Sequence, residues 1–218
     1  VRQRFHNPFE ATIEAEYVFP LPHDAAVNDF LMIIGERRIR GIIREKDEAR
    51  EIYERARRAG HVASLLEQER PNIFTQSVGN IGAGQEVRIE ISYVDVLKYD
   101  IQEYEFYFPM VVGPRFNPGQ PSGGVDPNPP ELQGKVSPPV ANTTRVPDAQ
   151  RISPPVMRPE VRNGHDISLT VTIDAGVPVE NLRVTNHQAD VERDGASRAV
   201  VKLRGSDSVP NKDFVVRY

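Results

Sequence analysis

Strict alternation of apolar and polar residues dominates the first half of the chain. Between residues 9 and 19 every odd position is apolar, whereas positions 10, 12, 14 and 16 are polar or charged. Because side chains alternate between the two faces of a strand, this pattern puts the apolar residues on one face and the polar residues on the other. One face is therefore expected in a core and the other in water. The alternation recurs at residues 87–93 and 104–108, and the strand-like residues 27–34 and 38–44 flank a predicted hairpin turn.

One segment departs from this period. In residues 45–60 the apolar positions are three and four apart, which indicates an amphipathic helix over about 46–59. Acidic residues lie near its start, basic residues lie near its end, and Gly60 is placed to terminate it. We expect this helix to lie over a sheet through five apolar residues: Ala49, Ile52, Tyr53, Ala56 and Ala59.

Alternation returns after residue 160, at 167–173, 182–184 and 199–203, and the apolar run 214–216 ends the chain's strand-like pattern. Many short strands separated by turns predict a mainly β fold: an antiparallel β-sandwich with one amphipathic helix, followed by a second, smaller antiparallel β unit. The last strand would form an open edge if the polypeptide ended with it. We therefore expect the polypeptide to continue beyond Tyr218.

Proline divides the chain, because 13 of its 19 prolines lie between residues 109 and 159. Proline lacks a backbone N–H and interrupts both helices and sheet ladders. We predict a domain at 1–116, a Pro/Gly-rich linker or strap at 117–159, and a β-rich connector at 160–218. Two descriptions of the middle segment stay open: a loose, polyproline-like excursion and a rigid, packed strap.

Composition narrows the function classes. The chain has no cysteine, which excludes disulfides, thiolate zinc sites and cysteine nucleophiles. Its net charge of -4 gives no overall attraction for nucleic acid or an anionic membrane, so neither is expected as a partner. The longest apolar run, residues 30–34, is far shorter than the roughly 20 residues of a membrane helix, and direct membrane insertion is not expected.

Candidate chemistry is sparse. The five histidines lack the spacing of a zinc ligand set, and we expect each to be an exposed loop residue. His23 and Asp24 are adjacent, and on an extended chain their side chains would point to opposite faces. The glycine-rich residues 79–84 lead into a strand rather than a helix, so no nucleotide site is expected. We predict no catalytic residue, metal or cofactor.

Two charged segments remain. Arg38, Arg40 and Arg44, with Arg37 beside them, could form an anion-binding strip, since side chains two apart on a strand share a face. The alternative is a solvated face whose ion pairs are each worth ~0.2–1 kcal/mol. In residues 63–78, we expect Arg70 to satisfy buried carbonyls or to pair with Glu67 or Glu69 at a kinked corner.

Three stretches, residues 14–22, 63–74 and 108–115, resemble the VIT (vault protein inter-alpha-trypsin) domain. The resemblance covers about residues 1–119 and suggests a bacterial protein in which a von Willebrand A domain accompanies the VIT domain. Residues 209–218 resemble the junction into that A domain, which is itself absent from this chain. The motif residues, to which we assign structural roles, are Phe19, Pro20, Leu21, Pro22, Leu65, Leu66, Glu67, Gln68, Glu69, Arg70, Pro71, Asn72, Ile73, Phe74, Pro109, Gly113, Pro114 and Arg115.

The resemblance implies a non-enzymatic interaction or scaffolding module of a secreted, periplasmic or surface-anchored protein. Its expected partners are another protein and the adjacent A domain, with a glycan also possible. Metal-dependent adhesion cannot be transferred, because the A domain's Asp-x-Ser-x-Ser motif is missing here. Two alternatives stay open: a glycan hydrolase using paired carboxylates, and a binder of sulfated polysaccharide using the arginine strip.

Overall fold

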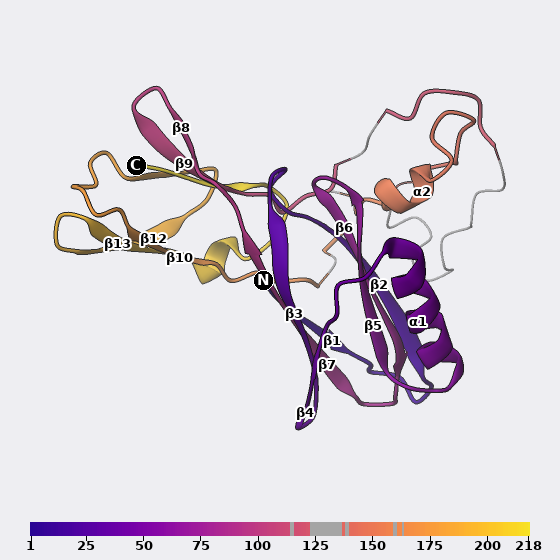
Figure 1. Ribbon diagram of the computed structural model, residues 1–218. Coiled ribbons are helices and arrows are strands. Elements are labelled where there is room, and N and C mark those ends of the chain that lie inside the picture. The colour runs from indigo at the N-terminus through magenta and orange to yellow at the C-terminus, as the bar shows by residue number, and fades with distance from the viewer. Residues whose placement is uncertain (114–115, 123–136, 138–139, 159–160, 163) are drawn as a thin grey trace. The chain divides into compact units, whose positions relative to one another are not determined.

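The computed structural model describes residues 1–113, 116–122, 137, 140–158, 161–162 and 164–218 (Figure 1). The chain divides into two compact units. Unit 1 contains residues 1–19 and 23–96, and unit 2 contains residues 20–22 and 97–218. The predicted class is confirmed: the described chain is mainly β, its sheets are antiparallel, and it has one sizeable helix.

The larger sheet of unit 1 has the strand order β1-β7-β3-β4. Alternate residues of its central strand β7 are buried, as the sequence predicts, with Val87 and Ile89 fully enclosed. The predicted hairpin is confirmed for its first strand, but the second strand ends at Arg40 rather than Arg44. The strands span β1 Arg2–His6, β3 Ala26–Ile34, β4 Arg37–Arg40 and β7 Glu86–Val94.

The second sheet of unit 1 has the order β2-β6-β5, with β2 Ile13–Pro20, β5 Ala63–Arg70 and β6 Ile73–Ile81. Its inner face meets the inner face of the larger sheet. Phe5 of β1 packs edge-to-face on Tyr17 of β2, with ring centroids 6.5 Å apart. Phe19 and Phe74 stack within the second sheet at 6.0 Å. Unit 1 is therefore the predicted sandwich.

The helix α1, Lys46–Arg58, covers the outer face of the β2-β6-β5 sheet (Figure 1). Its predicted end is confirmed, because Gly60 takes a left-handed φ of +78° and His61 N donates to Ala56 O at 3.0 Å. The predicted apolar contact is only partly right. Ile52 is 46% exposed and no helix residue is fully buried. Polar and charged side chains supply much of the contact between helix and sheet.

Unit 2 contains the sheets β11-β14-β9-β8 and β10-β13-β12. Their facing residues form one apolar core that includes Val201, Phe214 and Val216. The last strand, β14, lies between β11 and β9, so our expectation that it would be an open edge is wrong. The elements span β8 Lys98–Asp100, β9 Glu103–Phe108, β10 Thr170–Asp174, β11 Arg183–Thr185, β12 Ala189–Asp194, β13 Arg198–Leu203, η2 Gly205–Asp207 and β14 Phe214–Arg217.

The described part of the proline-rich segment includes the short helix α2, Ala149–Ile152. Ala149 and Ile152 are buried, and Thr143 Oγ1 donates to Pro118 O at 2.6 Å. These contacts are those of a packed segment. Strand β9, placed before the boundary at residue 116, pairs in the structure with β14 near the C-terminus. The domain limits at 116 and 159 stay predictions.

Candidate functional site

The first and third motif stretches lie mainly in buried positions. Phe19, Pro20, Leu21 and Pro22 are all buried, and Leu21 has no exposed surface. Pro109 is buried and Gly113 is exposed, while Pro114 and Arg115 lie outside the described residues.

The second motif stretch forms the β5–β6 hairpin. Ala63, Leu65, Glu67 and Glu69 share the face toward α1, while Leu66 and Phe74 lie on the opposite, inner face. The turn contains Pro71 and Asn72, and a bulge at residues 68–70 precedes it. Gln68 donates to Pro71 O at 3.1 Å, Arg70 Nη1 donates to Glu69 O at 2.6 Å, and Ile73 is fully buried.

A seam of ion pairs joins α1 to this hairpin and to β2. Arg50 donates to Glu67 Oε1 at 2.5 Å, and Lys46 donates to Glu69 Oε2 at 3.1 Å. The two glutamate side chains are only 5% and 2% exposed, so their charges depend on these partners. We call these four residues, with Arg57, the helix seam. Sequence reasoning placed the glutamates in a structural role but did not find their helix partners.

Arg57 completes the helix seam near the C-terminal end of α1. It donates to Glu14 at 2.7 Å and to Glu54 at 2.8 Å, and these hydrogen bonds raise the pKa of its guanidinium. Burial, followed by the nearby Glu14, raises the pKa of Tyr53 to about 12. Gly79 of β6 lies directly below: a Cβ there would be 3.1 Å from Tyr53 Oη and 3.2 Å from Arg57 Cγ. The close approach of helix and strand thus favours glycine, because a larger residue would have to displace these side chains.

Two asparagines that the sequence did not single out hold loops in place. Asn7 is fully buried, and its Nδ2 lies 2.8–3.0 Å from the carbonyl oxygens of Ala11, Ile81 and Gly82. Asn80, at a φ of +58°, donates to the carbonyl of Arg57 at 2.7 Å and so satisfies the end of α1. Both residues serve the scaffold.

The predicted anion strip is divided between two environments. Arg38 and Arg40 share one face of the edge strand β4, whereas Arg44 lies beyond the strand and pairs with Glu48 of α1 at 3.4 Å. Arg40 lies 3.5 Å from Asp29. The register continues the row: Arg38 lies opposite Ile33, Ile33 opposite Arg88, and Arg88 opposite Arg4. We call Arg2, Arg4, Arg38, Arg40 and Arg88 the arginine face.

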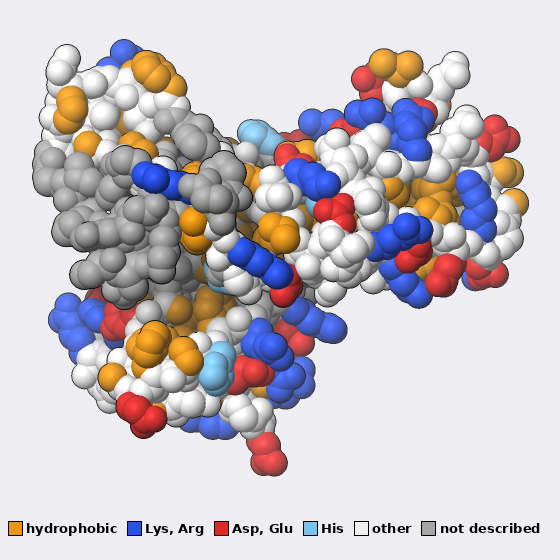
Figure 2. All heavy atoms as spheres, turned by 180° about the vertical axis from the view of Figure 1, so that it is seen from behind, with side chains coloured by type: hydrophobic (Ala, Val, Ile, Leu, Met, Phe, Trp, Pro, Cys, Tyr) orange, Lys and Arg blue, Asp and Glu red, His pale blue; other side chains and the backbone are white. Residues whose placement is uncertain are grey.

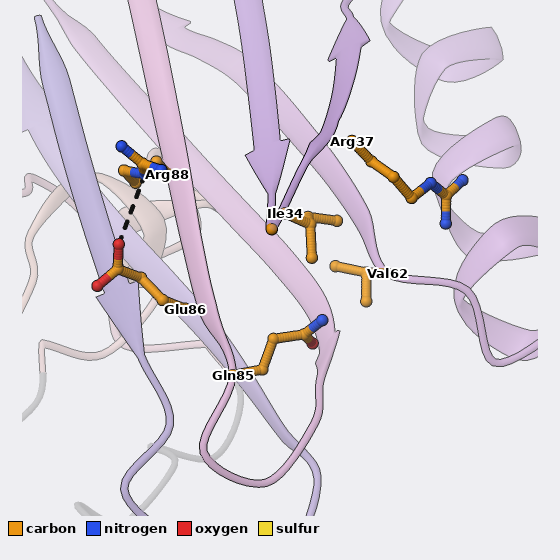
Figure 3. Close-up of a pocket in the computed structure, with 7 residues that line it drawn as sticks. Ile34, Arg37, Val62, Gln85, Glu86 and Arg88 are labelled. Carbon is orange, nitrogen blue, oxygen red and sulfur yellow. Dashed lines mark ion pairs between the residues drawn. The ribbon is translucent and has the colours of Figure 1, made fainter.

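A hollow of about 480 Å³ lies at one end of the larger sheet of unit 1 (Figure 3). Ile34, Val62 and Gln85 point toward one another around it, and Glu86 pairs with Arg88 at 3.5 Å on its side. Among the described residues that line it, Glu86 is the one carboxylate. A hydrolase of the predicted kind needs two converging carboxylates roughly 5–10 Å apart.

His187 corrects the expectation that every histidine is an exposed loop residue. Its side chain is fully buried, with Nδ1 3.0 Å from Asp207 Oδ2 and Nε2 3.0 Å from the carbonyl of Lys212. Both neighbours are acceptors, toward which the two ring nitrogens of His187 point. A backbone hydrogen bond from Gln188 is the main cause that lowers the pKa of Asp207. The cluster ties loops of unit 2 together.

His23 and Asp24 are also placed differently from the sequence expectation. They lie in a turn rather than an extended strand, and His23 Nδ1 is 3.0 Å from Asp24 Oδ1. Their side chains are 70% and 63% exposed, far from the enclosed setting that activates a catalytic base.

The described residues contain no cluster of three or more His, Asp or Glu side chains arranged to hold a metal ion. No helix in the described ranges is long and apolar enough to cross a membrane. Basic and acidic side chains are interspersed over the face shown in Figure 2. The arrangement is therefore one of bridging ion pairs on a β scaffold.

Comparison with known proteins decides the family of the first unit. Residues 1–93 match the family model of the vault protein inter-alpha-trypsin domain. Residues 1–93 form a VIT domain. The predicted resemblance is thus confirmed for this part of the chain, while a bacterial source stays a prediction.

Relatives of the VIT domain occur in several large proteins. The chain is 40% identical over 114 residues to mouse (Mus musculus) protein mono-ADP-ribosyltransferase PARP4, covering 52% of the chain and 6% of that protein. It is 31% identical over 115 residues to rat (Rattus norvegicus) von Willebrand factor A domain-containing protein 5A, covering 51% and 14%. It is 31% identical over 109 residues to mouse inter-alpha-trypsin inhibitor heavy chain H3, covering 49% and 12%. The chain therefore spans a small fraction of each relative.

Proposed function

We propose that the chain is a non-enzymatic protein-interaction and scaffolding module of a larger, secreted or surface-attached protein that also carries a von Willebrand A domain. The VIT match over residues 1–93 carries this proposal, because relatives named for an ADP-ribosyltransferase, an A domain and a protease-inhibitor heavy chain share the module. A module found beside such different activities is suited to binding. The A domain and a second protein are the proposed partners.

The arginine face is the proposed docking surface of the VIT domain. Arg4 and Arg88 are directly opposite on β1 and β7, an arrangement that disfavours folding because their like charges repel. Glu86 lies 3.6 Å from Arg4 and 3.5 Å from Arg88. Arg38 has no ion pair among the described residues. Arginine is enriched at protein interfaces. Because Arg4 and Arg88 share one carboxylate and Arg38 has none, an acidic protein surface would supply further counter-charge.

The test is site-specific photo-crosslinking in cells that express the full-length protein. A photoreactive residue at position 38 should yield one dominant protein adduct, and the same residue at position 52 on α1 should not. Ile52 is a suitable control because it is also exposed and lies in the same unit. Equal adducts from both positions, or none from position 38, would contradict the proposal.

A sulfated polysaccharide is the second candidate ligand of the arginine face, favoured by the register that aligns Arg4, Arg88 and Arg38 across the sheet, with Ile33 of β3 between the last two. If several arginines bind the polysaccharide, the protein should be retained on immobilised heparin, and this retention should weaken steeply as the salt concentration rises. Elution at low salt would remove this candidate and leave the protein partner. The hydrolase alternative receives no support from the hollow, because the one carboxylate among its described lining residues, Glu86, already pairs with Arg88.

A further inference from the structure

Three tyrosines form a row at one end of unit 2. Tyr99 of β8 lies opposite Tyr104 of β9, which exchanges two backbone hydrogen bonds with Tyr218 at 2.8 and 3.1 Å. The ring centroids are 4.8 Å apart for the first pair and 5.7 Å for the second. Tyr99 is 63% exposed and Tyr104 is 41% exposed. The row thus ends in an aromatic ring presented to solvent.

The row also ends at an open sheet edge. Strand β8 is the last in the order β11-β14-β9-β8, so its outer side has no partner strand within the described chain. Because Tyr104 directs its backbone groups toward Tyr218, the opposite residue Tyr99 directs its N–H and C=O away from β9. One donor and one acceptor are therefore available at the centre of the edge.

The sequence around this point is self-complementary. Lys98 and Asp100 flank Tyr99, both are exposed, and neither has an ion pair within the described chain. If a second copy lies antiparallel with Tyr99 opposite Tyr99, the two tyrosines exchange two N–H···O=C hydrogen bonds. In that register each Lys98 faces Asp100 of the other copy. The charges then match on both sides of the two-fold axis.

The two-residue hairpin turn next to β8 has unusual residues for its backbone conformation. Ile101 is 86% exposed, and it has a φ of +48°, followed by Gln102 at +65°. Two-residue turns of this kind favour Asn and Gly, and a β-branched residue at positive φ is strained. Such strain concentrates where a side chain has a function. In the two-fold register Ile101 would lie opposite Leu97 of the second copy, which gives this side chain an apolar neighbour.

We propose that two copies of this chain associate through their β8 edges, Tyr99 against Tyr99, to form a two-fold dimer with a continuous sheet. The interface is isologous, because the same residues of each copy meet. Short edge strands and edge lysines usually oppose such pairing. Here Lys98 of each copy would face Asp100 of the other, so its charge is compensated in the dimer. The paired surface is small, so the dimer is weak, with a Kd on the order of 10–100 µM. This inference is independent of the arginine face.

Sedimentation equilibrium over a concentration series tests the proposal. The unmodified chain should show a monomer–dimer equilibrium. Lys98→Asp or Asp100→Lys alone places like charges opposite one another, and each should weaken the dimer by about tenfold or more. The combined exchange, Lys98→Asp with Asp100→Lys, should restore it. Arg55→Glu, an exposed charge reversal on α1, is the matched control and should leave it unchanged.

A second variant separates pairing from charge. Tyr99→Pro removes an outward N–H that no internal ladder bond uses, so the fold should persist while the dimer is lost. Circular dichroism melting confirms that the fold is retained. A chain that stays monomeric at the highest concentration, or a dimer that survives both single charge reversals, would overturn the proposal.

Discussion

Asn7 shows how much of unit 1 depends on a single buried amide. Its side chain satisfies carbonyls from two separate loops, and its Oδ1 accepts from Phe9 N at 2.9 Å. We expect Asn7→Ala to lower the free energy of unfolding by about 2–3 kcal/mol, because buried carbonyls lose their donor. Urea unfolding measures this. Asn28→Ala, at an exposed position of β3, is the control and should change stability by less than about 0.5 kcal/mol.

The pair between Arg50 and Glu67 makes a second prediction at this scale. Removing the cation with Arg50→Met leaves a carboxylate whose side chain is only 5% exposed. The expected loss is about 2–3 kcal/mol, reduced from the fully buried case because Arg50 itself is partly solvated. The control Arg55→Met removes an exposed i,i+4 pair with Glu51 and should cost at most about 0.5 kcal/mol. Equal losses in the two variants would show that the helix seam carries no special weight.

These residues also show why the sequence did not reveal which side chains pair between elements. Periodicity identified Glu67 and Glu69 as unusual members of a strand, and the structure buries both. Their partners Arg50 and Lys46 lie 17 and 23 residues earlier, on a helix whose facing side no local spacing reveals. Asn7 gave no signal at all, since its role depends on a turn more than 70 residues away. Contacts between elements are set by packing rather than by local pattern.

At the scale of elements, α1 is held by groups that titrate in the alkaline range. The pKa of Tyr53 is raised from about 10 to about 12, chiefly by burial. A raised folded-state pKa means that the associated stability is fully present below pH 10 and is lost as the pH rises toward 12. The midpoint of unfolding should therefore decrease as the pH is raised from 9.5 to about 11.5.

The variant Tyr53→Phe isolates this contribution. It should flatten part of the alkaline decline, because phenylalanine keeps the ring but cannot ionise. Tyr107 of β9, whose pKa is also raised to about 12 by burial and by Asp213, accounts for a second part of the decline. An alkaline decline that is the same in the parent and in a Tyr53→Phe, Tyr107→Phe double variant would contradict this account.

Element by element, alternation was a good guide to strands and a poor guide to their limits. The strands β7, β9 and β13 appear where period two predicted them, and β14 coincides with the strand-like apolar run 214–216. Strand β4 ends at Arg40, one residue before Gly41, whose N–H still donates across the ladder to Phe30 O at 2.7 Å. The pairing of β9 with β14 joins segments about a hundred residues apart, which a one-dimensional pattern cannot specify.

At the scale of the whole molecule, the described chain combines a confirmed VIT domain with a second β unit. The ionisable groups that the structure brings together bridge elements rather than converge on a hollow. Arg183 pairs with Glu103 and Arg217 with Glu105 across the sheet of unit 2, as α1 pairs with its hairpin in unit 1. Such pairs fix geometry more than they add stability. Within each unit, these pairs therefore fix how neighbouring elements lie on one another.

The most direct test of the central claim, that the chain acts by binding through the arginine face, is a calorimetric Kd for the protein that crosslinks at position 38. Reversing two charges with Arg38→Glu and Arg40→Glu should weaken binding by about tenfold or more. The matched reversal Arg55→Glu with Arg58→Glu, on exposed positions of α1, should leave the Kd within about twofold. Equal affinity of all three proteins would contradict the account, as would turnover of a glycan or peptide that a carboxylate substitution abolishes.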